Sequence, residues 1–228
     1  MDDSSITRIA GLIGESGRIR MLTMMLDGSG HTASELAMAA DVSAQTASSH
    51  LGKLLEGGLI VCERRGRQRL FQLKSTEVAV AIEALGALAT EKRPNLAMPE
   101  LRFARTCYDH LAGALSIAVR DELLRRGALR NQRDDFALTQ EGEHFLRRLG
   151  IQAAPLRTLR RSFARKCLDW TERHHHVGGA VGAALLARFF EMKWLARMRH
   201  SRAVRITDEG ERQFERIFRV RCATLRSS

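Results

Sequence analysis

Residues 32–73, TASELAMAADVSAQTASSHLGKLLEGGLIVCERRGRQRLFQL, predict two short helices, a tight turn between them and a two-stranded ribbon. The first helix is expected over residues 32–39, where Thr32 and Glu35 have the spacing of a capping box. The second is expected over residues 44–56, with Ser43 as its N-cap and Gly57-Gly58 after its end, where glycine is preferred. This order of elements organises the rest of the chain.

The second helix has one apolar and one polar face. Its apolar positions recur at helical spacing and are expected in the core: Ala47, Leu51, Leu54 and Leu55. The other face and the N-cap carry small hydrogen-bonding or positive groups and no carboxylate: Ser43, Gln45, Thr46, Ser48, Ser49, His50 and Lys53. A helix that enters the major groove needs such donors and acceptors and no negative charge. These residues are the predicted major-groove contacts.

The ribbon after the glycines carries four arginines around its tip: Arg64, Arg65, Arg67 and Arg69. Arginines at such a tip suit contact with phosphates or insertion into the minor groove, so double-stranded DNA is the predicted partner. The alternative is an ordinary solvated hairpin after an ordinary pair of helices.

These motifs together resemble the winged helix-turn-helix of ArsR/SmtB-type transcriptional regulators. The matching residues are Glu35-Leu36-Ala37, Val42-Ser43, Thr46–Leu51, Leu54-Leu55, Gly57–Ile60 and Arg64–Arg67. The likeness spans about the first 90 residues. It implies that the second helix reads the major groove, that the ribbon is the wing, and that the protein is a homodimer on its operator.

Helices are also expected over residues 4–13, 18–26 and 75–91. The last has more apolar positions than one buried stripe requires, which fits a dimer interface. Residues 92–95 and Pro99 indicate a linker. The predicted domains are therefore residues 1–93, for DNA binding and dimerisation, and residues 94–228, for regulation.

The composition indicates a globular protein with charge concentrated in its second half. The 228 residues carry a net charge of +11. Residues 1–95 hold 11 basic and 11 acidic side chains, so the whole excess lies in residues 96–228. That excess suggests a second surface against DNA or an arginine-rich fold with surface pairs. The four scattered cysteines, and the lack of an apolar run of about 20 residues, predict a cytoplasmic protein with reduced thiols and no membrane partner.

The second half contains a divergent internal repeat, about residues 100–150 and 160–220. RTCYDHLAG at 105–113 is echoed by RKCLDW at 165–170 and HVGG at 176–179; FALTQEGEHFLRRL at 136–149 is echoed by VRITDEGERQFERI at 204–217. Each copy predicts a cysteine-containing start, a glycine-alanine helix (111–126 and 177–192), a strand pair and a threonine-capped helix. The fold class is therefore mainly α with small β-hairpins (α+β), and the C-terminal domain is helical, wing-like and duplicated. This pattern resembles the C-terminal extension of a longer subgroup of the same family.

The metal sites of the resembled family are missing from the sequence. Residues 36–41 contain no thiol, and the helix over residues 75–91 contains no histidine. The two copies instead bring Cys107, His110, Cys167 and His176 to equivalent places, with Asp109 and Asp169 beside them. Packed about a pseudo-two-fold axis, those four residues would form a Cys₂His₂ site for Zn²⁺ or another thiophilic ion.

Two other interpretations of this region stay open. The cysteines are equally compatible with core packing, and the aspartates with capping of the glycine-rich helices. Trp170 and Trp194 could line a pocket for an organic effector or belong to the core. Catalysis is not expected, because the sequence has no phosphate-binding glycine loop, nucleophile elbow or HExxH motif. Cys107 and His110, one helical turn apart, have no third orienting group.

The sequence predicts a homodimeric repressor that leaves its operator when an effector, a metal ion or a small organic molecule, acts on the C-terminal domain. Alternatives are a sequence-tolerant architectural DNA-binding protein and a regulator that senses oxidants through its thiols.

Overall fold

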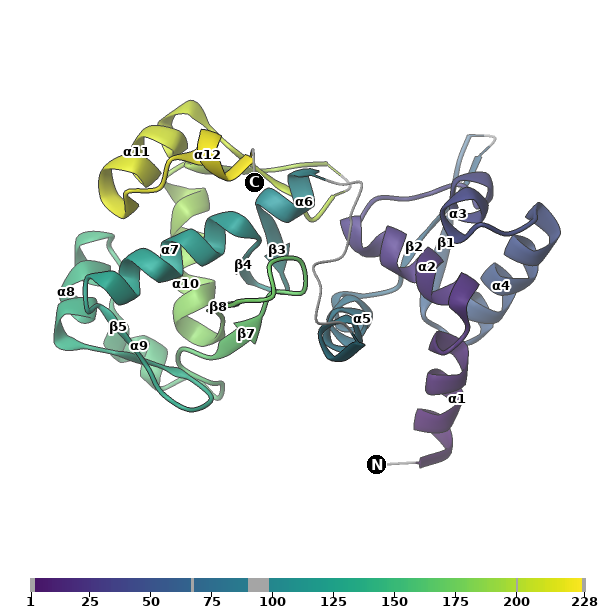
Figure 1. The fold of residues 1–228 in the computed structure, drawn as a ribbon, viewed down its shortest axis with the longest axis horizontal. Coiled ribbons are helices and arrows are strands. Elements are labelled where there is room, and N and C mark those ends of the chain that lie inside the picture. Colours follow the sequence, from purple (N-terminus) through teal and green to yellow (C-terminus); the bar gives the residue numbers. More distant parts are fainter. Residues whose placement is uncertain (1–2, 67, 90–98, 200, 227–228) are drawn as a thin grey trace. The chain divides into compact units, whose positions relative to one another are not determined.

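The computed structural model describes the chain except residues 1–2, 67, 90–98, 200 and 227–228. The chain divides into two compact units, residues 1–83 and 84–228 (Figure 1). The predicted boundary between residues 93 and 94, and the linker at 92–95, lie outside the described residues. The fold is mainly helical with several two-stranded hairpins, as predicted.

The first unit is a winged helix-turn-helix. Its elements are α1 (Asp3–Ile13), α2 (Ser16–Met24), the 3₁₀ turn η1 (Met25–Asp27), α3 (Ala33–Ala40), α4 (Ala44–Glu56), β1 (Ile60–Arg65), β2 (Gln68–Leu73) and α5 (Thr76–Ala89), which continues into the second unit. Thr32 and Glu35 form the predicted capping box of α3, and Ser43 caps α4 by accepting a hydrogen bond from the Thr46 N–H. Strands β1 and β2 are antiparallel, with Ile60 opposite Leu73 and Arg65 opposite Gln68.

The second unit repeats one motif twice. Helix α6 (Pro99–Phe103) precedes the first copy, which contains β3 (Arg105–Cys107), β4 (His110–Ala112), α7 (Ala114–Arg125), β5 (Leu129–Asn131), β6 (Phe136–Leu138), α8 (Gln140–Arg148) and α9 (Ala153–Arg157). The second copy contains β7 (Lys166–Leu168), β8 (His175–Val177), α10 (Gly179–Glu191), β9 (Leu195–Arg197), β10 (Val204–Ile206), α11 (Asp208–Phe218) and α12 (Cys222–Arg226). Thr139 and Thr207 cap α8 and α11 with the same hydrogen bond, as predicted.

One part of the predicted repeat was wrong. The glycine-alanine helices begin later than residues 111 and 177, because those residues pair in the hairpins β3–β4 and β7–β8. Cys107 and His110 therefore do not share a helical turn; they face each other across a hairpin. Gly113, the N-cap of α7, and Gly179, the first residue of α10, both have positive φ at the point where hairpin passes into helix.

Backbone hydrogen bonds link the two copies. The Phe136 N–H in the first copy donates to the Ala164 carbonyl in the second at 2.8 Å, and the Val204 N–H in the second donates to the Ala104 carbonyl before the first at 3.0 Å. These reciprocal contacts have the form expected of a pseudo-two-fold arrangement. Because each copy completes the other's hairpins, the two form one unit.

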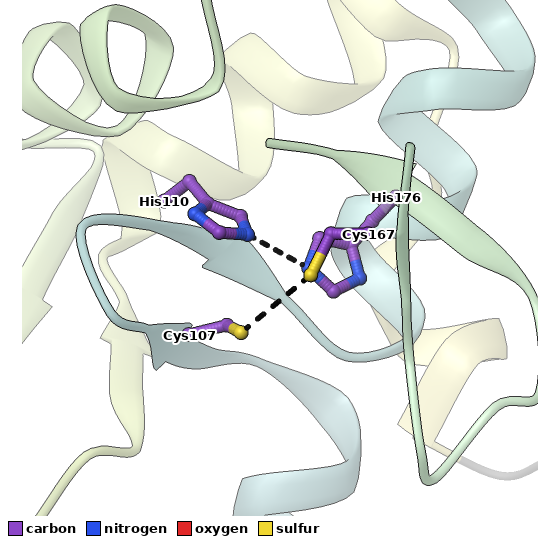
Figure 2. Close-up of side chains that lie close together, drawn as sticks. All are labelled: Cys107, His110, Cys167 and His176. Atoms are coloured by element: carbon purple, nitrogen blue, oxygen red, sulfur yellow. Dashed lines mark hydrogen bonds between the residues drawn. The ribbon is translucent and has the colours of Figure 1, made fainter. Parts of the chain in front are cut away.

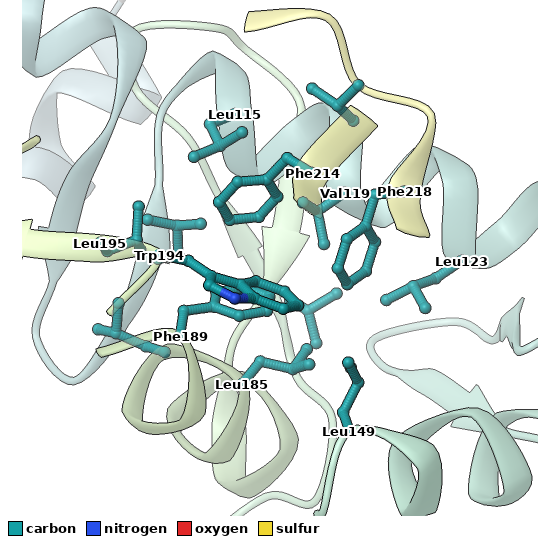
Figure 3. Packing of buried hydrophobic residues seen from close by; sticks show 14 of the residues in the cluster. Leu115, Val119, Leu123, Leu149, Leu185, Phe189, Trp194, Leu195, Phe214 and Phe218 are labelled. Carbon is teal, nitrogen blue, oxygen red and sulfur yellow. The ribbon is translucent and has the colours of Figure 1, made fainter. Parts of the chain in front are cut away.

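A single apolar core joins the copies (Figure 3). Phe189 on α10 stacks on Trp194 and meets Phe214 edge-to-face, with ring centroids 5.5 and 5.1 Å apart. Leu115 and Val119 of α7 close the same cluster from the first copy. The core interpretation of Trp194 is thus the one that the structure supports.

Candidate metal centre and DNA-binding surface

Two hairpins of the second unit each place a cysteine directly opposite a histidine. In β3–β4 the register pairs Cys107 with His110, and in β7–β8 it pairs Cys167 with His176. Side chains at opposed positions of an antiparallel pair project from the same face. Each hairpin therefore presents one thiol and one imidazole together, and the pseudo-two-fold arrangement turns the two pairs toward each other (Figure 2).

The four side chains have the spacing of a tetrahedral ligand set. Their ligand atoms all lie within 4.8 Å of one another, with 3.9 Å between the sulfurs of Cys107 and Cys167 and 3.1 Å between the Nε2 atoms of His110 and His176. A tetrahedral Zn²⁺, with Zn–S of about 2.3 Å and Zn–N of about 2.0 Å, separates two sulfurs by about 3.8 Å and two nitrogens by about 3.3 Å. The two like pairs are therefore close to the separations of a tetrahedral site, and the cluster could hold a metal ion.

Each histidine has a carboxylate behind it. His110 Nδ1 lies 3.3 Å from Asp109 Oδ1, and His176 Nδ1 lies 3.4 Å from Asp169 Oδ2. A carboxylate at Nδ1 orients the ring so that Nε2 presents its lone pair to a metal, and it increases the basicity of the ligand. Each imidazole therefore has a carboxylate beside Nδ1 and its Nε2 turned toward the other histidine.

Asp169 is the centre of a buried polar network. Its side chain is inaccessible to solvent and accepts hydrogen bonds from Arg105 Nη2 at 3.0 Å and from the Gly113 N–H at 2.6 Å. Arg105, also fully buried, donates to Thr171 Oγ1 and lies over the Trp170 ring. Burial raises the pKa of Asp169, but Arg105 and His176 outweigh it and hold that pKa well below its usual range.

The expected capping roles of the two aspartates were only partly right. Asp169 does bind the N–H of Gly113, the N-cap of α7, but that helix belongs to the other copy. Asp109 pairs instead with Arg161, whose Nη1 lies 2.5 Å from Oδ2. The network therefore links the two copies beneath the four ligands.

Glycines let the backbone approach this cluster closely. A Cβ at Gly178 would lie 3.2 Å from His110 Nε2 and 3.3 Å from Cys167 Cβ, and one at Gly182 would clash with the Val177 carbonyl oxygen. The glycine-rich start of α10 is thus required by the packing around His110.

The helix-turn-helix presents most of the predicted DNA contacts to solvent. Ser43, Gln45, Thr46, Ser48, Ser49 and Lys53 are exposed on or beside α4, and Arg64, Arg65 and Arg69 are exposed on the wing. The Ser43 and Thr46 hydroxyls also bond to each other at the N-cap. Arg67 lies outside the described residues.

His50 differs from the other predicted contacts in its exposure. Its side chain is only 12% exposed, and Nε2 lies 3.2 Å from Glu15 Oε2. Glu15 is the N-cap of α2 and accepts hydrogen bonds from the Gly17 and Arg18 N–H groups. His50 therefore ties α4 to the start of α2 and leaves less of its side chain exposed than the other predicted contacts.

Comparisons with known proteins identify a helix-turn-helix in the first unit. Residues 15–63 match the family model described as a helix-turn-helix domain. A protein of Bacillus subtilis (strain 168), described as the uncharacterized HTH-type transcriptional regulator YdfF, is 41% identical over 222 residues, which cover 95% of this chain and 98% of that protein. The chain belongs to the HTH-type transcriptional regulators.

Solved structures similar to this regulator include two from mycobacteria. One is the homodimeric winged helix-turn-helix domain of Mb0332 from Mycobacterium bovis, a possible ArsR-family regulator. Its sequence is 20% identical, its TM-score is 0.36, and the match covers 42% of this chain and 94% of that one. The other is the cadmium sensor CMTR from Mycobacterium tuberculosis. Its sequence is 28% identical, its TM-score is 0.31, and the match covers 40% of this chain and 97% of that one.

DNA binding by this regulator is assigned to its helix-turn-helix. None of the helices in the described ranges is long and apolar enough to cross a membrane.

The buried residues that support the four candidate ligands were not found from the sequence. Arg105 stands in the RTC run of the repeat, where it looked like one more arginine of a basic domain. Its equivalent, Arg165, in the RKC run, was the available signal, because a basic residue two positions before each cysteine is a repeated feature. Only the fold shows that Arg105 is fully buried and paired.

Proposed function

We propose that this regulator is a homodimeric repressor of the ArsR type, and that its effector is a thiophilic metal ion bound by Cys107, His110, Cys167 and His176. The observation that carries the proposal is the buried set of two thiols and two imidazoles at the junction of the two copies. Two soft and two borderline ligands in tetrahedral spacing favour Zn²⁺ or a similar ion over Mg²⁺ or Ca²⁺, which prefer oxygen.

The metal would act by fixing one arrangement of the two copies. Each hairpin contributes one thiol and one imidazole, so a bound ion ties β3–β4 to β7–β8. An ion changes operator affinity only if it favours one conformation of the regulator over another. We propose that the metal-bound form is the one that leaves the operator.

Exposed apolar side chains support the homodimer. Ile6 on α1 is 48% exposed, and Leu85 and Leu88 on α5 are 44% and 86% exposed. Apolar groups left in water on these helices are well suited to bury one another between two copies of the chain. A two-fold dimer would place two α4 helices on half-sites one turn of DNA apart.

The proposed DNA contacts are the exposed members of the predicted set. Base edges would be read from Gln45, Thr46, Ser48 and Ser49, with Ser43 and Lys53 on the phosphates. The wing would contact the backbone or minor groove through Arg64, Arg65, Arg67 and Arg69. These contacts carry DNA recognition whatever the effector proves to be.

The proposal is tested by measuring operator affinity with and without metal. Purified untagged protein is first examined by elemental analysis and thiol titration, then loaded with one Zn²⁺ per chain. Loading should weaken operator binding at least about fivefold, the lower end of ordinary allosteric coupling. The Cys107→Ser/Cys167→Ser variant should show no such response, and Cys62→Ser, a thiol of the wing, should respond like the parent. Stoichiometric binding with unchanged operator affinity would contradict a sensing role.

The 3.9 Å sulfur–sulfur distance also favours a second candidate, a thiol switch. Peroxide would take two electrons and two protons from the thiols of Cys107 and Cys167, which form a disulfide, while the peroxide becomes two water molecules. Peroxide should then abolish operator binding in the metal-free protein, and a reductant should restore it. Equally tight binding to random duplex would instead favour an architectural role.

A further inference from the structure

A cavity of about 980 Å³ lies in the second unit, separate from the four proposed metal ligands. Its walls come from α6, α7, β10 and α12 and from residues 172 and 174 in the turn before β8. Cavities that bind small organic molecules measure about 300–1,000 Å³, so this one is large enough for a drug-sized ligand.

The cavity has an apolar surface with cationic groups on it. Apolar lining comes from both copies and from α6, and includes Phe103, Ile117, Ala118, Val204, Ile206 and Leu225. Ala118 and Ile117 are only partly buried, so their exposed surface faces this space. An apolar group bound there would remove that surface from water, which is favourable.

Four arginines and three carboxylates (Glu100, Asp121 and Glu172) line the same cavity, so its charged lining sums to +1, and three of the arginines are ion-paired. Arg102 Nε lies 3.7 Å from Glu172 Oε1, Arg120 Nε lies 2.7 Å from Asp121 Oδ1, and Arg226 Nη2 lies 2.9 Å from Glu211 Oε1. Arg205, which is exposed on β10, has no ion pair within the described part of the chain. The cavity wall thus carries a positive charge that is available to an anion.

The two copies carry different residues at the places of Arg205 and Arg120. Where β10 has Arg205, the equivalent strand β6 has Ala137; where α7 has Arg120, α10 has Leu186. Both copies form the same hairpin and helix with these different residues. Arg205 and Arg120 are therefore features of one copy and are not part of the motif that the two copies share.

The cavity also borders the metal centre's hairpin. Arg120 Nη1 donates to the His175 carbonyl oxygen at 2.6 Å, and His175 directly precedes the ligand His176. Glu172 and His174 lie between Asp169 and that ligand and line the cavity. A molecule in the cavity would contact the segment that positions His176.

We propose that this cavity is a binding site for an amphipathic organic acid, whose apolar body fills the space between α7 and β10 while its single carboxylate pairs with Arg205. An apolar, partly enclosed space with one available arginine suits a monoanion of this kind, since the guanidinium can form two parallel hydrogen bonds to a carboxylate. The site would act beside the proposed metal centre and does not require it.

The test is isothermal titration of the full-length protein, without DNA, against two probes: decanoate and 2-naphthoate. The neutral alcohol decanol serves as the uncharged comparison for decanoate. Four proteins are compared: the parent, Arg205→Glu, Ala118→Phe, and Arg147→Glu. Arg147 is the matched control, because it is an exposed arginine on α8 without an ion pair in the described structure and lies away from the cavity lining.

At least one of the two acids should bind the parent. If that acid is decanoate, it should bind at least about tenfold tighter than decanol, because the alcohol cannot form the charge-assisted hydrogen bond of the carboxylate. Arg205→Glu should weaken that acid at least about tenfold, and Arg147→Glu should not change it. Ala118→Phe should weaken it by filling the space, with an unchanged thermal midpoint of the free protein showing that it folds. Two results would overturn the proposal. One is an equal loss of affinity in Arg205→Glu and Arg147→Glu. The other is that neither acid binds with a Kd below roughly 1 mM.

Discussion

At the residue scale, the proposed metal centre depends on which nitrogen of each histidine faces the other ligands. Nε2 of both rings points into the site, and a carboxylate lies next to each Nδ1. The two carboxylates differ in their surroundings. Asp169 is fully buried and also balances the charge of Arg105, whereas Asp109 is one-third exposed and pairs with Arg161 on the surface. Asp109 is therefore the carboxylate that can be changed without disturbing the core.

Asp109→Asn should weaken metal binding by about 10-fold or more, the usual effect of removing an outer-shell partner of a histidine ligand. Competition with a chromogenic chelator measures the affinity. Asp134→Asn, which changes another exposed aspartate in a turn of the same unit, is the control. Equal affinities in all three proteins would show that His110 is oriented by its backbone alone.

The acidic residue that holds the end of α7 is Glu122. Hydrogen bonds from Arg125, opposed by burial and helped by Arg126, lower the pKa of Glu122 to about 2 from the usual 4.5. Because its pKa is lower in the folded protein, its contribution to stability is complete above about pH 4.5 and is lost as the pH falls towards 2. The carboxylate therefore stabilises the fold at neutral pH.

Glu122→Gln should reduce the free energy of unfolding most at neutral pH, and its difference from the parent should shrink as the pH falls from about 4.5 towards 2. Urea unfolding at a series of pH values measures this difference. Glu191→Gln, a mostly exposed glutamate at the end of α10, should differ little from the parent throughout. A pH-independent difference for Glu122→Gln would mean that its packing, and not its charge, is what matters.

At the element scale, the proposed DNA contacts are divided between α4 and the wing. Helix α4 is held in place by its apolar face and by His50, which leaves its small polar residues exposed. The wing is a short hairpin whose tip carries exposed arginines. Arginines on phosphates give affinity for every sequence, whereas polar groups on base edges give preference for one.

Arg65→Ala/Arg67→Ala should weaken binding to operator and random duplex alike, and should reduce the slope of log affinity against log salt by about 1 for each phosphate that the wing no longer neutralises. Fluorescence anisotropy at several salt concentrations measures that slope. Arg147→Ala, a change on α8, should leave it as in the parent. A slope unchanged in the double variant would exclude phosphate binding by the wing.

At the scale of the whole molecule, the C-terminal unit is stabilised by one core that two divergent copies share. Phe214 of α11 is fully buried and meets both Phe189 and Trp194 edge-to-face. Both tryptophans of the chain, Trp170 and Trp194, are buried in this unit. Tryptophan fluorescence therefore reports the unfolding of this unit without a contribution from the helix-turn-helix.

Phe214→Ala should lower the free energy of unfolding of the C-terminal unit by about 3–5 kcal/mol, because it removes a large buried ring and leaves a cavity. Urea unfolding followed by tryptophan fluorescence measures the loss. Leu159→Ala, at a position that is 49% exposed, should change little. If the copies fold as one unit, the signals of both tryptophans should be lost in one transition, and two separate transitions would contradict the shared core.

Local signals in the sequence were sufficient for the helix-turn-helix. The Thr32–Glu35 capping box, the Ser43 cap and the Gly57-Gly58 end each act within a few residues, so spacing alone located α3, α4 and the wing. The repeat was also visible, since Thr139 and Thr207 start their helices in the same way. Spacing could not show that His50 turns inward, because its partner Glu15 is 35 residues away.

The sequence by itself determined the elements of this protein and the four residues that make the metal centre plausible. Only the tertiary structure decided that Cys107, His110, Cys167 and His176 meet, because their two hairpins are brought together by backbone pairing between copies about sixty residues apart. It also decided that Arg105 is a buried partner of Asp169 and that Arg205 lines a cavity. Contacts over such separations depend on how the whole core packs, and no local pattern of residues encodes them.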